Sequence, residues 1–191
     1  MWATTLHDQA VPALQWGAVI SGSLVAAALD ARSRRIPNWL TGGLLAAGLL
    51  NAGLTAGAVG LADAGAAMFV LALPYVILFA CAGGGAGDAK LMGAIGAWLG
   101  LVQGTLVLCT VCLAGIVLAL VWAAAGRRLS QVLSHVGLVA RGAALPFFGA
   151  GSLRDVPSLI PTPEECQKMP YGLAICSGVL IGLAALPFLP L

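Results

Sequence analysis

The sequence has 191 residues, of which 60% are hydrophobic and 8% are charged, and its mean hydropathy is +1.00. A soluble globular domain is excluded, because a chain of this length cannot bury so much apolar surface in a core, and a membrane protein is indicated. The net charge of +2, without basic runs interleaved with aromatic residues, gives no sign of nucleic-acid binding.

Six apolar stretches follow one another along the chain, each bounded by charges, glycine clusters or prolines. A membrane-spanning helix needs roughly 20 apolar residues. The first stretch follows a segment without Lys or Arg, so we expect a retained helix and not a secretory signal. We expect a single-domain, all-α membrane protein over residues 1–191 with about six transmembrane helices, at 11–29, 39–59, 62–81, 89–102, 104–125 and 171–188.

The basic residues all fall on one side of such a bundle. Lys and Arg near the ends of spans stay in the cytoplasm. With the N-terminus outside, the external segments hold acids such as Asp8 and Asp63, and all nine basic residues are cytoplasmic: Arg32, Arg34, Arg35, Lys90, Arg127, Arg128, Arg141, Arg154 and Lys168. The sequence therefore predicts an external N-terminus.

One long connection, residues 126–169, precedes the last stretch. Its start places Leu129, Val132, Leu133 and Val136 at helical spacing after two arginines. This pattern suits either an amphipathic helix in the membrane interface or a cytoplasmic helix packed on the bundle. We expect a cytoplasmic or interfacial loop, irregular beyond its first helix because four prolines follow.

Asp30 closes the first apolar stretch, one turn before Arg34-Arg35-Ile36-Pro37-Asn38. Proline disfavours helix at the preceding residue, so the first helix is expected to stop near Ile36, and the Asn38 side chain can cap the next helix. Asp30 therefore lies near a helix end at the cytoplasmic boundary. An ion pair with Arg34, four residues on, is the alternative role.

Asp88 ends the sequence Gly83-Gly84-Gly85-Ala86-Gly87-Asp88 and opens the fourth stretch. Glycines allow positive φ and a close approach of another chain, which an extended substrate strand requires. The alternative role of Asp88 is a helix N-cap, favoured by the helix dipole.

Together the two aspartates predict an acid pair. The expected topology places both at the cytoplasmic face, and ionisable groups near hydrocarbon are costly and are candidates for function. Two carboxylates that share a proton can hydrolyse a peptide bond without a metal or a protein nucleophile. One takes a proton from water while the other protonates or hydrogen-bonds the scissile carbonyl.

Other chemistries find less support in the sequence. His7 and His135 are far apart and have no Cys or acid cluster at ligand spacing, so neither a metal nor another cofactor is expected. Cys109 and Cys112 form a Cys-x-x-Cys inside an apolar span without a neighbouring charge, which favours packing. A membrane thiol oxidoreductase built on them is the alternative.

Three segments in this order resemble the type IV prepilin peptidases. The first is Asp30 with Arg34-Arg35-Ile36-Pro37-Asn38, and the second, Gly85-Ala86-Gly87-Asp88-Ala89-Lys90-Leu91-Met92, contains the Gly-x-Gly-Asp signature of intramembrane aspartyl proteases. The third, Met169-Pro170-Tyr171-Gly172-Leu173-Ala174-Ile175, resembles the small branch that serves Flp/Tad pili, the TadV or CpaA type. The resemblance covers roughly residues 21–182.

This resemblance implies an aspartic endopeptidase of the bacterial inner membrane that cleaves the leader peptides of type IV prepilins or pseudopilins at the cytoplasmic face. Asp30 and Asp88 would be the catalytic acids. The other motif residues would shape the site or bind substrate: Pro37, Asn38, Gly85, Gly87, Lys90, Pro170, Tyr171 and Gly172. Prepilins and membrane lipid are the expected partners, and the sequence leaves the oligomeric state open.

The bifunctional branch of the family carries a cytoplasmic insertion with paired Cys-x-x-Cys zinc ligands and also methylates the mature pilin. The present sequence lacks that insertion, so peptidase activity without methyltransferase activity is expected. A non-catalytic membrane assembly factor, in which the acids serve as a helix cap and an ion pair, is the alternative from another class.

Overall fold

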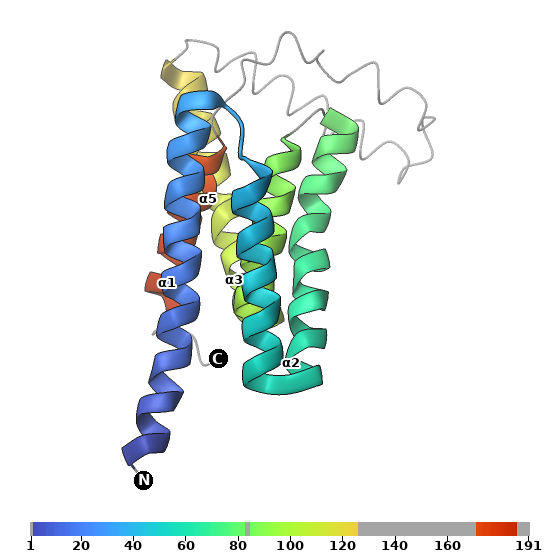
Figure 1. The fold of residues 1–191 in the computed structure, drawn as a ribbon. Coiled ribbons are helices and arrows are strands. Elements are labelled where there is room, and N and C mark those ends of the chain that lie inside the picture. Colours follow the sequence, from blue (N-terminus) through green and yellow to red (C-terminus); the bar gives the residue numbers. More distant parts are fainter. Residues whose placement is uncertain (1, 83–84, 126–170, 187–191) are drawn as a thin grey trace, which may run out of the picture.

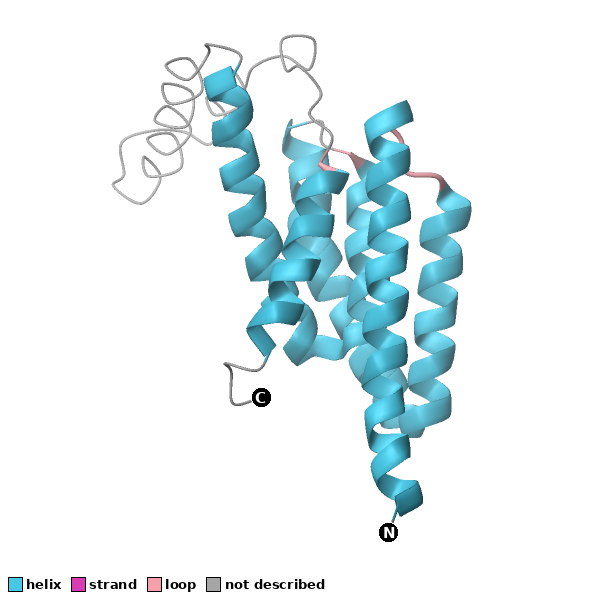
Figure 2. Cartoon of the chain, turned by 90° about the vertical axis from the view of Figure 1, so that its left-hand side faces the viewer, coloured by secondary structure: helices cyan, strands magenta, loops and turns pink. Residues whose placement is uncertain are grey.

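The computed structural model describes residues 2–82, 85–125 and 171–186. Within them the regular structure is helical: α1 (Trp2–Ser33), α2 (Asn38–Ala82), α3 (Ala86–Ala125) and α5 (Gly172–Ala185). The described residues contain no strand (Figure 2), so the all-α prediction is confirmed. The loop expected at 126–169 lies outside the described residues.

Both long helices fold back on themselves (Figure 1). α2 reverses at Gly57, with φ 62° and ψ −146°, and α3 reverses at Gly100, with φ 70° and ψ −175°. Backbone of this kind is open essentially only to glycine. Each helix therefore has two limbs, 38–56 and 58–82 in α2 and 86–99 and 101–125 in α3. The sequence predicted breaks between spans near residues 60 and 103, and the two glycines lie about three residues before these positions.

Among the described residues, three helices are long and apolar enough to cross a membrane, at Ala13–Ser33, Asn38–Ala80 and Ala86–Val121, and Gly172–Ala185 is a shorter apolar helix. α1 runs from Trp2 to Ser33 and is therefore longer than the expected first span, 11–29. α1 continues through Asp30 and Arg32 because neither residue breaks a helix. It stops where Arg34 takes a positive φ of 52°, shortly before Pro37.

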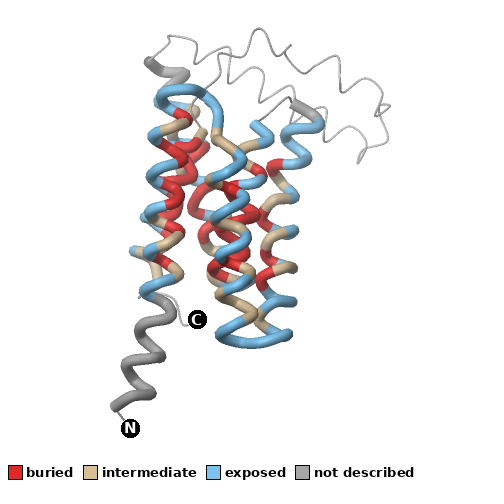
Figure 3. The backbone as a smooth tube through the Cα atoms, viewed as in Figure 1, coloured by how far each residue is buried: buried red, intermediate tan, exposed pale blue. Residues whose placement is uncertain are grey.

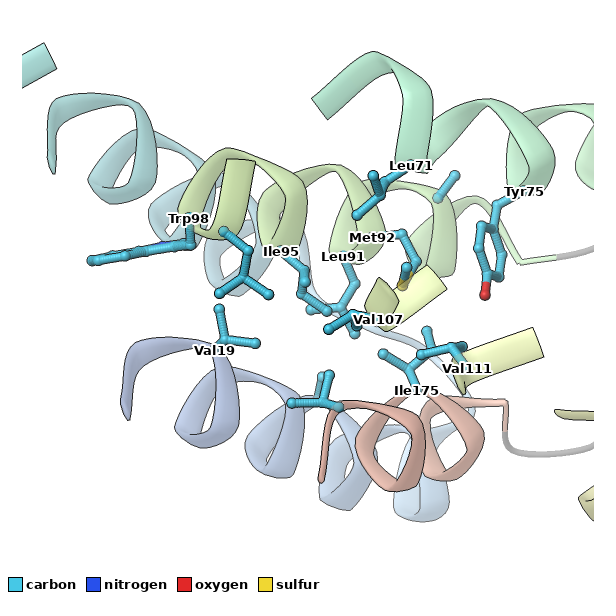
Figure 4. Close-up of a cluster of buried hydrophobic side chains, with 14 of the residues drawn as sticks. Val19, Leu71, Tyr75, Leu91, Met92, Ile95, Trp98, Val107, Val111 and Ile175 are labelled. Atoms are coloured by element: carbon cyan, nitrogen blue, oxygen red, sulfur yellow. The ribbon is translucent and has the colours of Figure 1, made fainter. Parts of the chain in front are cut away.

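The limb 86–99 forms the centre of the bundle. All residues from 91 to 99 are buried, whereas the other limbs expose large apolar side chains along their outer sides (Figure 3). A helix that is apolar all round and buried all round is typical of a bundle core. Figure 4 shows Leu91, Met92, Ile95 and Trp98 from this limb meeting Val19 of α1, Leu71 of α2 and Ile175 of α5.

The bundle has two distinct ends (Figure 1). The upper end holds the α1–α2 connection, 34–37, and the starts of α3 and α5, whereas the lower end holds the reversals at Gly57 and Gly100. The cationic residues among those described lie at or near the upper end: Arg32, Arg34, Arg35 and Lys90. At the lower end, Asp63 accepts a hydrogen bond from the Leu101 amide, with Oδ2 3.3 Å from the nitrogen.

Candidate active site

Asp30 is held by a residue far along the chain. Its side chain is 8% exposed, and its Oδ2 accepts a hydrogen bond from the Gly172 amide at 2.9 Å. Glycine makes this approach possible, because a Cβ on residue 172 would lie 3.0 Å from the Asp30 Cβ and 3.1 Å from Oδ2. The Arg34 side chain is exposed beyond the helix end, and the buried Asp30 carboxylate is bound by α5 and not by Arg34, the partner in the alternative role.

Asp88 lies in the first turn of α3, and its side chain is half-buried. The helix begins at Ala86, so the capping position is Gly85, whose carbonyl accepts from the Asp88 amide at 3.1 Å. The carboxylate folds back over this glycine, since a Cβ on Gly85 would lie 2.5 Å from Asp88 Oδ2. Asp88 is thus the third helical residue and not the N-cap, and Gly85 leaves room for its carboxylate.

The other residues of the first two motifs form contacts between the start of α3 and the α1–α2 connection. A Cβ on Gly87 would lie 3.0 Å from the Ile36 Cβ, so glycine lets the start of α3 lie against this connection. Lys90 Nζ donates to Asn38 Oδ1 at 2.7 Å. The sequence predicted that the Asn38 side-chain oxygen caps α2, but this oxygen accepts from Lys90. The Pro37 carbonyl accepts from the amides of Leu40 and Thr41 and opens that helix instead.

These contacts bring Asp30 and Asp88 together at the upper end, although they come from α1 and α3. The two carboxylates lie close enough for their charges to interact. Two carboxyl groups at this range can act as a pair. Such a pair can both accept a proton from water and donate one to a carbonyl.

Tyr75 is a site residue that sequence reasoning missed. It packs edge-on against Tyr171, with ring centroids 6.0 Å apart and an interplanar angle of 70°, and these are the only two tyrosines in the sequence. Both lie close enough to Asp88 to interact with it electrostatically. A tyrosine in an otherwise apolar run was the available signal, because buried tyrosine usually needs a polar partner.

Pro170, the remaining predicted site residue, lies outside the described residues. Cys109 and Cys112 are unpaired and exposed on the second limb of α3, a position that suits contact with lipid. Among the described residues, no group of three or more His, Cys, Asp or Glu side chains is arranged to hold a metal ion.

A family model described as the type IV leader peptidase family matches residues 17–120. The match runs from α1 through most of α3 and includes Asp30, Tyr75 and Asp88. Neither the curated proteins nor the solved structures give a match. Since the matched region is more than half of the 191 residues, the chain belongs to the type IV leader peptidase family.

Proposed function

We propose that the protein is an aspartic endopeptidase that removes the leader peptides of prepilins with Asp30 and Asp88 as its catalytic pair. Family membership supports a peptidase of the prepilin leader type. The observation that carries the aspartic mechanism is the meeting of two carboxylates, from α1 and from the first turn of α3, at one end of an apolar bundle.

In the proposed reaction a water molecule lies between the two acids and the scissile carbonyl. The ionised acid takes a proton from this water as the oxygen bonds to the carbonyl carbon, and the protonated acid hydrogen-bonds the carbonyl oxygen. When the C–N bond breaks, the leaving amine receives a proton from the pair. The Gly172 amide fixes the orientation of the Asp30 carboxylate, and Gly85 leaves space for that of Asp88.

The proposed topology has six membrane crossings, an external N-terminus and the acid pair facing the cytoplasm of a bacterial inner membrane. Two reversing helices give four of these crossings, and α1 and α5 give the others. The cationic upper end is the end that the distribution of Lys and Arg assigns to the cytoplasm. Substrate leaders would then be cut on the side where they are made.

The proposed substrates are Flp/Tad-type prepilins or pseudopilins, and the proposed branch is the small TadV or CpaA type. Support comes from the segment around Tyr171 and Gly172, which resembles that branch and which contacts Tyr75 and Asp30. The lack of the insertion with paired Cys-x-x-Cys supports a peptidase without methyltransferase activity.

The deciding experiment is cleavage of an Flp-type prepilin by the purified protein in detergent. Asp30→Asn and Asp88→Asn should each abolish cleavage, because an amide can neither accept the proton of water nor share one with its partner. Asp63→Asn is the matched control, since it changes an aspartate at the lower end and should leave cleavage intact. Cleavage by both amide variants at normal protein level would reject the acid pair and favour an assembly factor.

A further inference from the structure

The buried hydroxyl of Tyr75 has no hydrogen-bond partner among the described residues. The side chain is 6% exposed and extends from the second limb of α2 into the core, on the side of Val111 and Ile175 (Figure 4). Tyr171 is in edge contact with it, but the two hydroxyls do not form a hydrogen bond of acceptable geometry. A buried polar group without a partner is costly and calls for an explanation.

The position of Tyr75 indicates what could satisfy its hydroxyl. It lies seven residues before the end of α2 at Ala82, roughly 10 Å along the helix axis. Tyr75 therefore lies within an apolar span, against Tyr171, and still within electrostatic reach of Asp88.

A peptide must be extended where it is cut, and its unpaired amide groups are costly at the depth of the hydrocarbon unless protein groups bind them. We propose that the Tyr75 hydroxyl donates a hydrogen bond to a main-chain carbonyl of the substrate, in the extended residues that follow the scissile bond. This inference rests on the proposed leader peptidase function and adds a substrate-binding residue to it.

Tyr75→Phe tests the proposal because it removes the hydroxyl and keeps the ring. We expect kcat/KM for a purified Flp-type prepilin to fall about tenfold, the effect of losing one hydrogen bond. The change should lie mainly in KM, because a contact away from the scissile bond binds substrate and transition state alike. The unfolding temperature should not fall, since an unpartnered hydroxyl contributes nothing to stability.

Thr110→Val is the matched control, since the Thr110 hydroxyl is also buried but donates to the Gly178 carbonyl at 2.7 Å. This variant should lose stability and keep the KM of the wild type. A Tyr75→Phe protein with wild-type KM would overturn the proposal, and so would one that loses stability as Thr110→Val does. If Asp88→Asn still cleaves, the leader peptidase function fails and this inference falls with it. If Asp88→Asn is inactive while Tyr75→Phe keeps the wild-type KM, only the role of Tyr75 fails.

Main-chain ester substitution in the substrate identifies the acceptor, because an ester carbonyl accepts hydrogen bonds weakly. Esters placed in turn at the first four residues after the scissile bond should include one that raises KM for the wild type but not for Tyr75→Phe. Equal effects on both enzymes at every position would reject the contact.

Discussion

At the residue scale, three glycines of the sequence motifs are explained by what stands beside them. Gly85 faces the Asp88 carboxylate, Gly87 faces Ile36, and Gly172 faces Asp30. In each case the missing side chain leaves space for a contact at the acid pair. The two glycines of the Gly-x-Gly-Asp signature are therefore explained by close packing around the acid pair and not by flexibility of a loop.

Gly172→Ala should lower leader cleavage at least tenfold. The added methyl group would push α5 away from Asp30 and weaken the amide bond to its carboxylate, and a hydrogen bond to a charged group is worth about 1.5–3 kcal/mol. Each 1.4 kcal/mol corresponds to about a factor of ten. Initial cleavage rates at matched protein concentration measure the effect.

Gly43→Ala is the control for this substitution, because a Cβ there meets no other atom within 4 Å. It should cleave at the wild-type rate. A Gly172→Ala enzyme as active as the Gly43→Ala enzyme would show that the Asp30 carboxylate does not depend on this amide.

The sequence singled out Asp30 and Asp88 as candidates, because acids are rare in apolar spans and each stood beside a recognisable helix boundary; their role stays a prediction. A tyrosine in an apolar run was visible in the sequence, but nothing in that run says that the face of Tyr75 is the one that meets the site. Nor could the sequence reveal the partner of Asn38, because the contact with Lys90 joins residues 52 positions apart.

At the element scale, α5 and the second limb of α3 are in backbone contact. A Cβ on Gly178 would overlap the Val111 backbone, and the Thr110 hydroxyl donates to the Gly178 carbonyl at 2.7 Å. Small residues allow this approach where helices associate in lipid by packing alone.

Gly178→Ala should lower the free energy of unfolding by about 1–3 kcal/mol, the usual cost of inserting a methyl group into a packed contact. The neighbour is main chain, which cannot move aside as a flexible side chain would. Thermal unfolding in detergent is the measurement. Gly65→Ala, at a helical position with no atom within 4 Å of the added Cβ, should be neutral or slightly stabilising, and an equal loss for both variants would contradict the contact.

The two reversals offer a comparison of backbone strain with side-chain crowding. A Cβ on Gly57 meets nothing within 4 Å, whereas a Cβ on Gly100 would collide with the Asp63 carboxylate. Gly57→Ala should therefore cost about 1–3 kcal/mol through its positive φ alone, and Gly100→Ala should cost more. In an Asp63→Ala background the cost of Gly100→Ala should drop to that of Gly57→Ala. Equal costs of Gly100→Ala in both backgrounds would show that Asp63 plays no part.

At the scale of the whole molecule, the proposed orientation rests on the charges at the two ends of the bundle. Among the described residues the cations lie at or near the upper end with the acid pair, and Asp63 lies at the lower end. Hydropathy alone located the apolar stretches to within a few residues, since glycine and charge interrupt them. It could not show that the limb 86–99 is the buried centre, because hydropathy does not distinguish an apolar face that meets other helices from one that is exposed on the outside of the bundle.

Cysteine labelling tests this orientation in a variant whose five native cysteines are replaced by serine. Ser33→Cys, at the upper end, should react with an impermeant maleimide only in inverted vesicles, and Ala58→Cys, beside the lower reversal, only in spheroplasts. Labelling of both residues from one side would reject the topology. The parent without cysteines should still cleave prepilin, which a thiol oxidoreductase mechanism would not allow.

The bond between Asp30 and the Gly172 amide joins residues 142 positions apart. During synthesis, the first acid therefore enters the membrane long before the group that orients it. Until α5 has inserted, a nascent chain carries both carboxylates but lacks the fixed geometry between them. Under the proposed mechanism the nascent chain would therefore stay inactive until α5 has inserted, because that helix orients Asp30.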